Sequence, residues 1–451
     1  MSFYHSMVRR LFFSLAAMAL LLTACSDNDS FSTDRSYRLT FSRDTVRMDT
    51  LFSQVPSTTY TFWAYNFSGD GLRIRTVRLD RGNQSGFRVN VDGTFLNPVA
   101  NDFEVRKGDS IRVFVEITSH ENQQAEAQLV EDNLIFTLES GVEQRVNLRT
   151  FSWDAEKMTN MVVTGDEIIE SSKPVVVYGT GITVKEGATL TIKNTHLYFH
   201  DGAGIDVKGR LVMENVLLRG DRLDHMFGYL PYDRVSGQWR GITVSKKKSS
   251  IEMTDCELHS SHTGLDADST IIALKNCVIH NCKGFGLYAF DSEVTIENCL
   301  FSNALDDCLS LHGCEASIVN STLAQFYPFS ANRGVALRFG NTKQPMLLGC
   351  ANTLVTGYAE DVAMGEKSGD DPEQFDYYFE NCILRTPALE DANRIKDVIF
   401  EKSSDPVQGK GHFVRFDDTN FIYDFHVKEE SPAYEKHIGW QNLPTAEPSE
   451  Q

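Results

Sequence analysis

Three things are scarce in this 451-residue sequence: positive charge, cysteine in the first half of the chain, and long apolar runs. The 62 acidic residues outnumber the 43 lysines and arginines, which gives a formal net charge of −19. Such a surface repels phosphate backbones, so we expect no nucleic-acid partner. It also repels an anionic polysaccharide unless a cation bridges the two. Apolar residues make up 41% of the chain, which is typical of globular proteins and argues against extensive disorder.

The N-terminal segment has the pattern of an export signal. Arg9 and Arg10 precede an apolar run over residues 11–22, and small residues follow it. This run is too short to span a membrane as a helix. We therefore predict a secretory signal peptide over residues 1–24.

The residues at the end of this signal resemble a lipoprotein processing site. Leu22-Thr23-Ala24-Cys25 is similar to the bacterial lipobox, in which the cysteine becomes the new N-terminus and carries the lipid. Ser26-Asp27-Asn28-Asp29 resembles the signal that sends Bacteroidota-type lipoproteins to the outer face of the outer membrane. The resemblance implies an outer-membrane protein that faces the exterior, anchored in the lipid by acylated Cys25, with residues 25–36 as acylated cysteine and linker. An ordinary signal peptide with an incidental cysteine is the alternative.

Residues 37–154 read as a series of short strands. Seven segments alternate apolar and polar residues, and turn formers such as those at residues 68–71 separate them. Seven strands at this spacing predict an immunoglobulin-like β-sandwich. No cysteine lies between residues 37 and 153, so the disulfide of antibody domains is absent. The segment resembles the immunoglobulin-like modules that stand between lipid anchor and cargo in other surface lipoproteins, which implies a spacer.

Residues 160–398 contain an internal repeat of two alternating phrases. The first is apolar-x-apolar-x-Asn before a small or sulfur-containing residue, and the second is Gly-apolar-x-apolar. Copies without insertions lie 21 to 23 residues apart, which predicts a right-handed parallel β-helix in an all-β chain. Successive coils would lie about 4.8 Å apart, so equivalent side chains would stack. The first phrase ends at Asn194, Asn215, Asp255, Asn276, Asn298, Asn320 and Asn381, and the second begins at Gly181, Gly204, Gly241, Gly264, Gly286 and Gly334.

One column of this repeat is rich in cysteine. Its other members are Thr, Val and Ser, so the position favours a small buried side chain, and we predict buried thiols rather than a metal site or disulfides. The asparagines that precede the column are expected to bond to backbone at turns. Three further cysteines lie outside the column, and a disulfide among them stays open. The column holds Cys256, Cys277, Cys299 and Cys382, and the others are Cys282, Cys308 and Cys314.

Two insertions, residues 221–240 and 323–333, lie at the same corner of the coil and carry most of the candidate ligand-binding residues. About four coils separate them, so we expect them to stand about 19 Å apart with a polar floor between. Aromatic rims beside a polar floor suit a sugar chain, because each pyranose offers a C–H face to a ring. The alternative is that the aromatic residues pack on one another and fold the insertions down. The predicted ligand-binding residues are Phe227, Tyr229, Tyr232, Trp239, Phe326, Tyr327 and Phe329, with His262 and His280 on the floor.

Residues 294–311 resemble the segment of polygalacturonases in which an Asp-Asp-Cys triplet supplies catalytic carboxylates. Asp306, Asp307 and Cys308 fall on that motif. The neighbouring coils depart from the family, because Lys283 replaces the partner carboxylate and Arg333 replaces the histidine. Glycoside hydrolysis by an acid/base pair therefore lacks a second carboxylate, so the resemblance implies the fold and not the activity.

The same residues also resemble the site of polysaccharide lyases on this fold, which use Lys or Arg as the base. Lys283, Asp306, Asp307 and Arg333 would be its catalytic set, and Asp306 and Asp307 would hold a Ca²⁺ that neutralises a uronate. The alternative is a surface ion pair between Asp307 and Arg333 worth under about 1 kcal/mol. The histidines His259, His262, His280 and His312 do not recur at metal-ligand spacing on one face, which argues against a histidine metal site.

Residues 399–451 leave the repeat, and we expect them to close the open end of the solenoid as a polar cap. The sequence therefore predicts a lipid-anchored cell-surface β-helix protein that binds polysaccharide without catalysis. One alternative is a Ca²⁺-dependent lyase of uronate-containing glycans, and another is a structural or adhesive protein with a protein partner. No cofactor is expected outside the lyase alternative.

Overall fold

The computed structural model describes residues 30–369 and 371–441. The predicted signal peptide and Cys25 lie outside the described residues. The chain forms two compact units, one ending at Ser152 and one beginning at Trp153, and the second also includes residues 49–53 and 121–128. None of the helices in the described ranges is long and apolar enough to cross a membrane.

The N-terminal unit is built from two β-sheets. Phe62 and Phe136 come from different sheets and pack edge to face with ring centroids 6.4 Å apart, so a buried core lies between the sheets. The immunoglobulin-like assignment stays a prediction. One sheet runs in the order β1 (Thr40–Phe41), β4 (Tyr60–Tyr65), β9 (Ser110–Ile117), β6 (Phe87–Val91) and β7 (Thr94–Phe95), and the other in the order β2 (Thr45–Arg47), β11 (Glu143–Trp153), β10 (Gln128–Leu138), β5 (Leu72–Leu79) and β8 (Val99–Val105).

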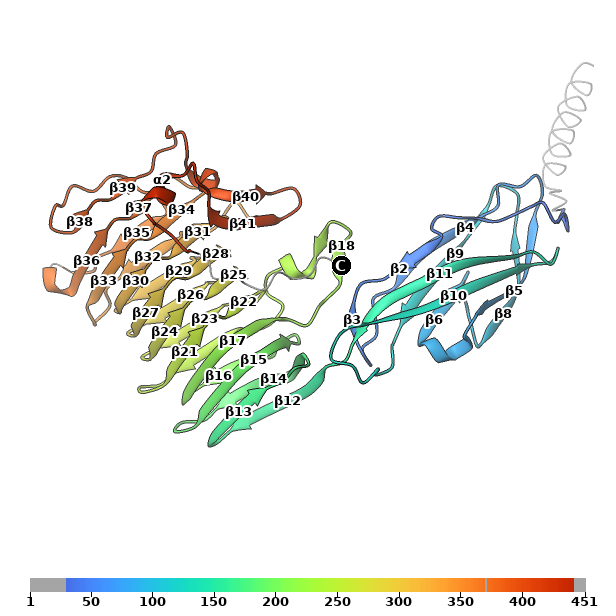
Figure 1. Cartoon of the computed structure of the whole chain (residues 1–451), viewed down its shortest axis with the longest axis horizontal. Coiled ribbons are helices and arrows are strands. Elements are labelled where there is room, and N and C mark those ends of the chain that lie inside the picture. Colours follow the sequence, from blue (N-terminus) through green and yellow to red (C-terminus); the bar gives the residue numbers. More distant parts are fainter. Residues whose placement is uncertain (1–29, 370, 442–451) are drawn as a thin grey trace, which may run out of the picture. The chain divides into compact units, whose positions relative to one another are not determined.

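The C-terminal unit is a parallel β-helix that runs from β12 (Glu156–Val163) to β39 (Ile399–Phe400), as Figure 1 shows. Its coils pair in register through three parallel ladders. The first contains β13 (Asp166–Glu170), β15 (Thr189–Phe199), β17 (Arg210–Gly220), β21 (Ser250–Thr254), β24 (Ile271–Lys275), β27 (Glu293–Glu297), β30 (Glu315–Val319), β33 (Met346–Ala351), β36 (Phe375–Glu380) and β38 (Ile395–Lys396).

The second ladder continues from the ends of β15 and β17 and is called the lateral sheet below. The third ladder starts in the second half of β12, continues through β14 (Val175–Val184) and is called the front sheet. The lateral sheet contains β22 (Glu257–His259), β25 (Val278–Cys282), β28 (Leu300–Ala304), β31 (Thr322–Gln325), β34 (Leu354–Gly357), β37 (Ile383–Leu384) and β39. The front sheet contains β16 (Gly204–Val207), β20 (Ile242–Ser245), β23 (Leu265–Asp268), β26 (Leu287–Phe290), β29 (Leu309–His312), β32 (Leu337–Gly340) and β35 (Ala363–Glu366).

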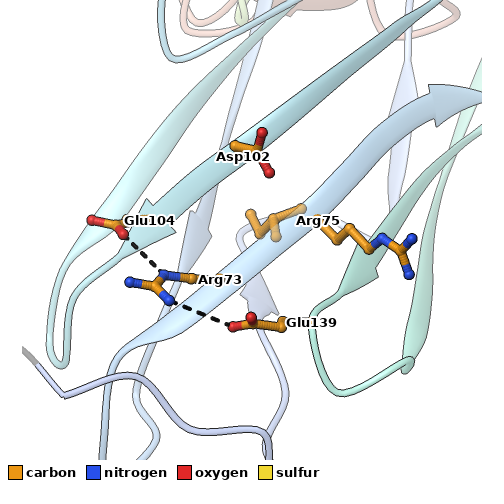
Figure 2. Close-up of a pocket in the computed structure, with 6 residues that line it drawn as sticks. Arg73, Arg75, Asp102, Glu104 and Glu139 are labelled. Atoms are coloured by element: carbon orange, nitrogen blue, oxygen red, sulfur yellow. Dashed lines mark hydrogen bonds and ion pairs between the residues drawn. The ribbon is translucent and has the colours of Figure 1, made fainter.

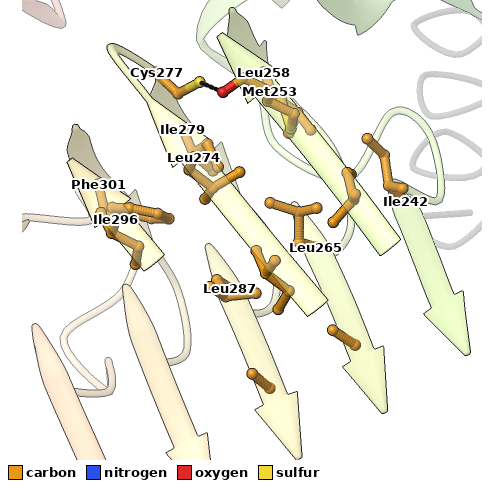
Figure 3. Packing of buried hydrophobic residues seen from close by; sticks show 14 of the residues in the cluster. Ile242, Met253, Leu258, Leu265, Leu274, Cys277, Ile279, Leu287, Ile296 and Phe301 are labelled. Atoms are coloured by element: carbon orange, nitrogen blue, oxygen red, sulfur yellow. Dashed lines mark hydrogen bonds between the residues drawn. The ribbon is translucent and has the colours of Figure 1, made fainter. Parts of the chain in front are cut away.

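Stacked aliphatic columns form the core of the β-helix. Leu258 pairs with Ile279 and Ile279 with Phe301, so one inward column passes through three coils (Figure 3). All three side chains are buried. Each stabilises the fold by roughly 1.5–3 kcal/mol, because its apolar surface is removed from water. The Gly334 copy of the repeat is out of register by two residues, because β32 begins at Leu337 opposite Leu309.

The asparagine column forms a ladder of side-chain amides. Asn276 and Asn298 have φ values of 54° and 53°, a left-handed conformation that asparagine tolerates better than most residues. Their side chains bond to the previous coil rather than to the backbone of their own turns, since Asn276 donates to Asp255 at 2.8 Å and Asn298 donates to Asn276 at 2.9 Å. Asn352 also belongs to this column and donates to Asn320.

The eight described cysteines are free and buried. The thiol of Cys277 donates to the carbonyl of Met253 at 3.4 Å, a contact drawn in Figure 3. Burial raises the pKa of Cys282 and of Cys314 to about 11, so both stay protonated at neutral pH. The structure therefore has Cys282, Cys308 and Cys314 as thiols rather than as a disulfide.

The C-terminal segment lies along the lateral sheet, so it does more than close the end of the solenoid. Outward-facing Leu300, Leu354 and Ile383 form one apolar cluster with Phe413 and Phe425 of this segment. Further along, the backbone of residues 439–441 bonds to three successive coils. The segment contains β40 (Phe413–Asp417), β41 (Ile422–Val427) and α2 (Pro432–Glu435), and short 3-10 turns occur at Gly82–Ser85, Pro372–Gln374 and Gly409–His412.

A buried ionic network anchors this segment to the last coils. The Glu401 carboxylate pairs with Arg385, accepts from the Gly409 amide at 2.7 Å, and lies 2.9 Å from Nε2 of His412. Burial alone would raise the pKa of Glu401, but His412 and Arg385 outweigh it and lower that pKa. Glu401 directly follows β39, the last strand of the lateral sheet, which ends at Phe400, two residues past the predicted boundary at 398.

We predict that Glu401 makes the fold sensitive to acid. Its folded pKa lies below the ordinary value of 4.5, so the unfolded chain binds more protons and the stabilisation is lost as the pH falls below that value. Glu401→Gln should lower the unfolding temperature at neutral pH and flatten its decline between about pH 4.5 and pH 3. Thermal unfolding of both proteins across this range checks it. An equal decline in both would contradict the assignment.

Candidate functional site

The insertion at residues 221–240 carries the most exposed of the predicted ligand-binding rings. Its hairpin consists of β18 (His225–Phe227) and β19 (Leu230–Pro231), and we call residues 225–231 the aromatic hairpin. Phe227 and Tyr229 are 55% and 64% exposed, and their rings stack 5.7 Å apart at 14°. Tyr232 follows the hairpin, partly buried under the guanidinium of Arg222 at 4.0 Å.

Trp239 does not project from this insertion, contrary to the prediction. It is 2% exposed and stacks on Phe199 with centroids 4.3 Å apart. Its indole N–H donates to the carbonyl of His259 at 2.9 Å. The end of the insertion has rejoined the coil at this point, because Trp239 bridges to Ser261 in parallel. Its ring is therefore core and is not available to a ligand.

The second insertion also turns most of its rings inward. Phe326 is 1% exposed and packs against Phe416 of the C-terminal segment, while Phe329 remains partly exposed. Tyr327 is buried, and its hydroxyl lies 2.8 Å from Oγ of Ser236 in the first insertion. The two insertions therefore touch, so the prediction of rims about 19 Å apart across an open floor was wrong. For Trp239, Phe326 and Tyr327 the packing alternative holds.

Two of the four residues of the lyase alternative, Asp307 and Arg333, are held by structural contacts. Asp307 is 4% exposed, accepts from the Val335 amide at 2.8 Å, and pairs with Arg338 at 2.7 Å. Arg333 donates to the carbonyl of Ser330 and lies over the ring of Tyr358 at 4.5 Å. The predicted pair of Asp307 and Arg333 is therefore replaced by Asp307 and Arg338.

Lys283 and Asp306 remain on the surface near these residues. The methylene chain of Lys283 lies so close to Gly237 that a Cβ there would come within 2.7 Å of it. Burial and the charge of Asp307 raise the pKa of Asp306, while His262, which is exposed, opposes that shift. Asp307 already has both carboxylate oxygens engaged, so the structure does not bring Asp306 and Asp307 together as a Ca²⁺ site.

The outer face of the front sheet is a polar surface that the sequence analysis missed. Asp266 pairs with Tyr288, Tyr288 with Ser310 and Ser310 with Arg338, so these outward side chains form one column. The ring of Tyr288 lies 5.6 Å from that of His312. The signal was present in the sequence, because Asp266 and Tyr288 occupy the x position of the phrase Gly-apolar-x-apolar.

A histidine cluster lies on the lateral sheet. The expectation that the histidines do not recur on one face was wrong for His259 and His280. β22 and β25 pair in register, so His259 and His280 stack with ring centroids 4.8 Å apart. Glu257 Oε1 lies 2.9 Å from His280 Nε2. Within the described ranges these three residues are the one group of this kind whose ligand atoms all lie within 4.8 Å of one another. His259 and His280 are one coil apart in the repeat, which was the overlooked signal.

A surface pocket of about 570 Å³ occurs in the N-terminal unit (Figure 2). Arg73 lies between two acidic partners there, 2.9 Å from Glu104 and 3.9 Å from Glu139. These three side chains are about half exposed and neutralise one another in part. The pocket contains none of the predicted site residues, and three of its charged side chains already pair with one another.

Comparisons with known proteins bear on the fold. No curated protein matches the chain. Among solved structures, a family 123 glycoside hydrolase from Clostridium perfringens shows 6% identity and a TM-score of 0.18 over 26% of each chain, so the chain spans about a quarter of that protein. The catalytic unit of a GH87 alpha-1,3-glucanase from Streptomyces thermodiastaticus shows 11% identity and a TM-score of 0.22 over 75% of this chain and 87% of that one. A family model described as right handed beta helix region matches residues 157–323, which with the parallel ladders defines a right-handed β-helix protein.

We predict that Asp307 contributes to stability rather than to chemistry. Asp307→Ala removes the acceptor of the Val335 amide and one of the two carboxylate partners of Arg338, and should cost about 1–3 kcal/mol of unfolding free energy. The control Asp306→Ala removes the exposed neighbour and should change that free energy by less than about 0.5 kcal/mol. Denaturant unfolding of the three proteins checks this. Equal stability of Asp307→Ala and the parent would rule out the structural role.

Proposed function

We propose that the protein is a lipid-anchored cell-surface β-helix protein that binds polysaccharide without cleaving it. The observation that carries the proposal is the exposed, nearly parallel pair of Phe227 and Tyr229 on the aromatic hairpin. Large rings with this exposure leave much apolar surface in water, which a ligand would cover. In a stacked pair each ring keeps one outer face, and the C–H face of a pyranose fits such a ring face.

The outer face of the front sheet supports the same function by a different chemistry. The exposed Asp266 carboxylate can accept hydrogen bonds from sugar hydroxyls, and the partly exposed Tyr288 adds a ring in the same column. The net charge of −19 favours a neutral glycan over an anionic one. Binding to a uronate polymer would therefore require a bridging cation.

The contacts of the lyase residues favour binding without catalysis. A base must be free to approach the proton that it abstracts, and a Ca²⁺ ligand needs a free carboxylate. Arg333 is held by Ser330 and Tyr358, and Asp307 is held by Val335 and Arg338. Two of the four groups are thus committed to other partners.

The remaining parts of the proposal concern placement on the cell. We propose acylation of Cys25 as the anchor in the outer membrane and an immunoglobulin-like fold for residues 37–154 as the spacer. The two-sheet architecture of the N-terminal unit supports the spacer. The lipobox-like residues 22–25 and the acidic residues that follow support the anchor.

We expect the aromatic hairpin to carry glycan binding. In affinity electrophoresis against neutral and uronate-containing polysaccharides, with and without Ca²⁺, the full chain should be retained by at least one polymer. Phe227→Ala and Tyr229→Ala should each weaken that retention about tenfold, a loss of about 1.4 kcal/mol.

The matched control is Phe67→Ala, since Phe67 is 68% exposed and stacks on Tyr65 at 5.4 Å in the N-terminal unit. It should leave retention unchanged. Absence of retention on every polymer would contradict glycan binding and leave the structural or adhesive alternative. Release of unsaturated, ultraviolet-absorbing products that Lys283→Ala abolishes would establish the lyase instead.

We expect Cys25→Ser to separate the anchor from the fold. Without the sulfur that carries the lipid, the protein should leave the membrane fraction and appear in the soluble fraction of cells that export it. Cell fractionation with and without the substitution checks this. Membrane association that survives Cys25→Ser would contradict acylation at this residue.

A further inference from the structure

The histidine cluster of Glu257, His259 and His280 has the composition and the burial of a metal site. Glu257 and His259 come from β22 and His280 comes from β25, so both elements belong to the rigid lateral sheet. His259 is buried, His280 is mostly buried, and Glu257 remains partly exposed, which leaves a path from solvent. Asp233 of the insertion lies beside the cluster, with Oδ1 3.8 Å from His259 Nε2.

The contacts of His259 define which ring nitrogen carries the proton. The hydroxyl of Ser260 donates to the carbonyl of Asp233 at 3.1 Å, so its oxygen is free to accept from His259 Nδ1 at 2.8 Å. Nδ1 therefore carries the hydrogen, and Nε2 presents a lone pair. A metal-binding histidine commonly has this arrangement, in which the other ring nitrogen donates to a second partner.

The lone pair on Nε2 faces a carboxylate, which is unfavourable unless a cation lies between them. The distance of 3.8 Å from His259 Nε2 to Asp233 Oδ1 is too long for a hydrogen bond, and neither atom carries a proton to share. Arg219 pairs with Asp233 Oδ1 at 2.6 Å and neutralises part of this charge.

We propose that Glu257, His259 and His280 bind one divalent transition-metal ion of the zinc class, with Asp233 or water in the fourth position. Imidazole nitrogens favour such ions over Ca²⁺ and Mg²⁺, which prefer oxygen ligands. Ligands about 2.0–2.1 Å from Zn²⁺ lie about 3.3 Å apart around a tetrahedron. The present ligand atoms lie within 4.8 Å of one another, and the His280–Glu257 distance is already 2.9 Å. Metal binding would therefore draw the three ligand atoms closer together than they lie now.

This site would fasten the insertion at residues 221–240 to the lateral sheet. Ser260 already connects the Asp233 carbonyl to His259. An ion that also bound Asp233 would join the insertion to both β22 and β25. The proposal does not rest on glycan binding, because none of its ligands belongs to the aromatic hairpin or to the front sheet. The two functions can therefore fail independently.

Metal binding by the full chain tests the proposal directly. After treatment with a chelator and its removal, the protein is dialysed against Zn²⁺ and the bound metal is quantified; Co²⁺ then serves as a spectroscopic probe. We expect one ion per chain, a rise in unfolding temperature with Zn²⁺, and the visible absorption of Co²⁺ with imidazole ligands in a four-coordinate site. His280→Gln and Glu257→Gln should weaken binding on the order of 100-fold.

The matched control is His262→Gln, which removes an exposed histidine three residues after His259. This variant should bind the ion as tightly as the parent chain. Circular dichroism shows whether each variant is folded, and His280 and Glu257 are preferred to buried His259 for this reason. Failure of the parent chain to retain Zn²⁺ would overturn the proposal. Retention that is equal in His280→Gln and His262→Gln would also overturn it, since the ion would then bind elsewhere.

Discussion

In-register hydrogen bonding between parallel coils is the constraint on which the rest of this structure depends. A coil has few backbone partners within itself, so its N–H and C=O groups are satisfied by the coils before and after it. Register then decides every lateral contact, because a side chain meets the residue one repeat away in the sequence. The inward columns, the amide ladder and the stacked histidines all follow from this one arrangement.

The same constraint explains why so much of the chain is used to cover the lateral sheet. Strand alternation sends every second side chain outward, and on this sheet Leu300, Leu354 and Ile383 are apolar. The C-terminal segment covers these residues. The insertion at residues 221–240 covers the more polar coils, where His259 and Ser260 meet Asp233. The front sheet presents Asp266 and Tyr288 instead.

The repeat could be predicted from the sequence because its physics is local. Each copy of the Asn phrase marks a left-handed turn, and the apolar positions beside it mark inward side chains such as Ile272 and Ile296. The conformations of the insertions could not be predicted in this way. Trp239 and Phe326 look like exposed rings in the sequence, yet each finds apolar neighbours from distant segments that no spacing rule identifies. The histidine cluster could have been found by comparing His259 and His280, which lie three residues after Cys256 and Cys277 in neighbouring coils.

The path of the C-terminal segment has a consequence for how the molecule matures. The backbone of Gly439, Trp440 and Gln441 bonds to Asn352, Thr322 and Asn298, which belong to coils made about ninety to one hundred and forty residues earlier. A growing polypeptide can therefore stack its coils in order of synthesis. The outward apolar side chains of the lateral sheet stay exposed until these late residues have been made. During that time this exposed apolar surface makes the incomplete chain prone to aggregation.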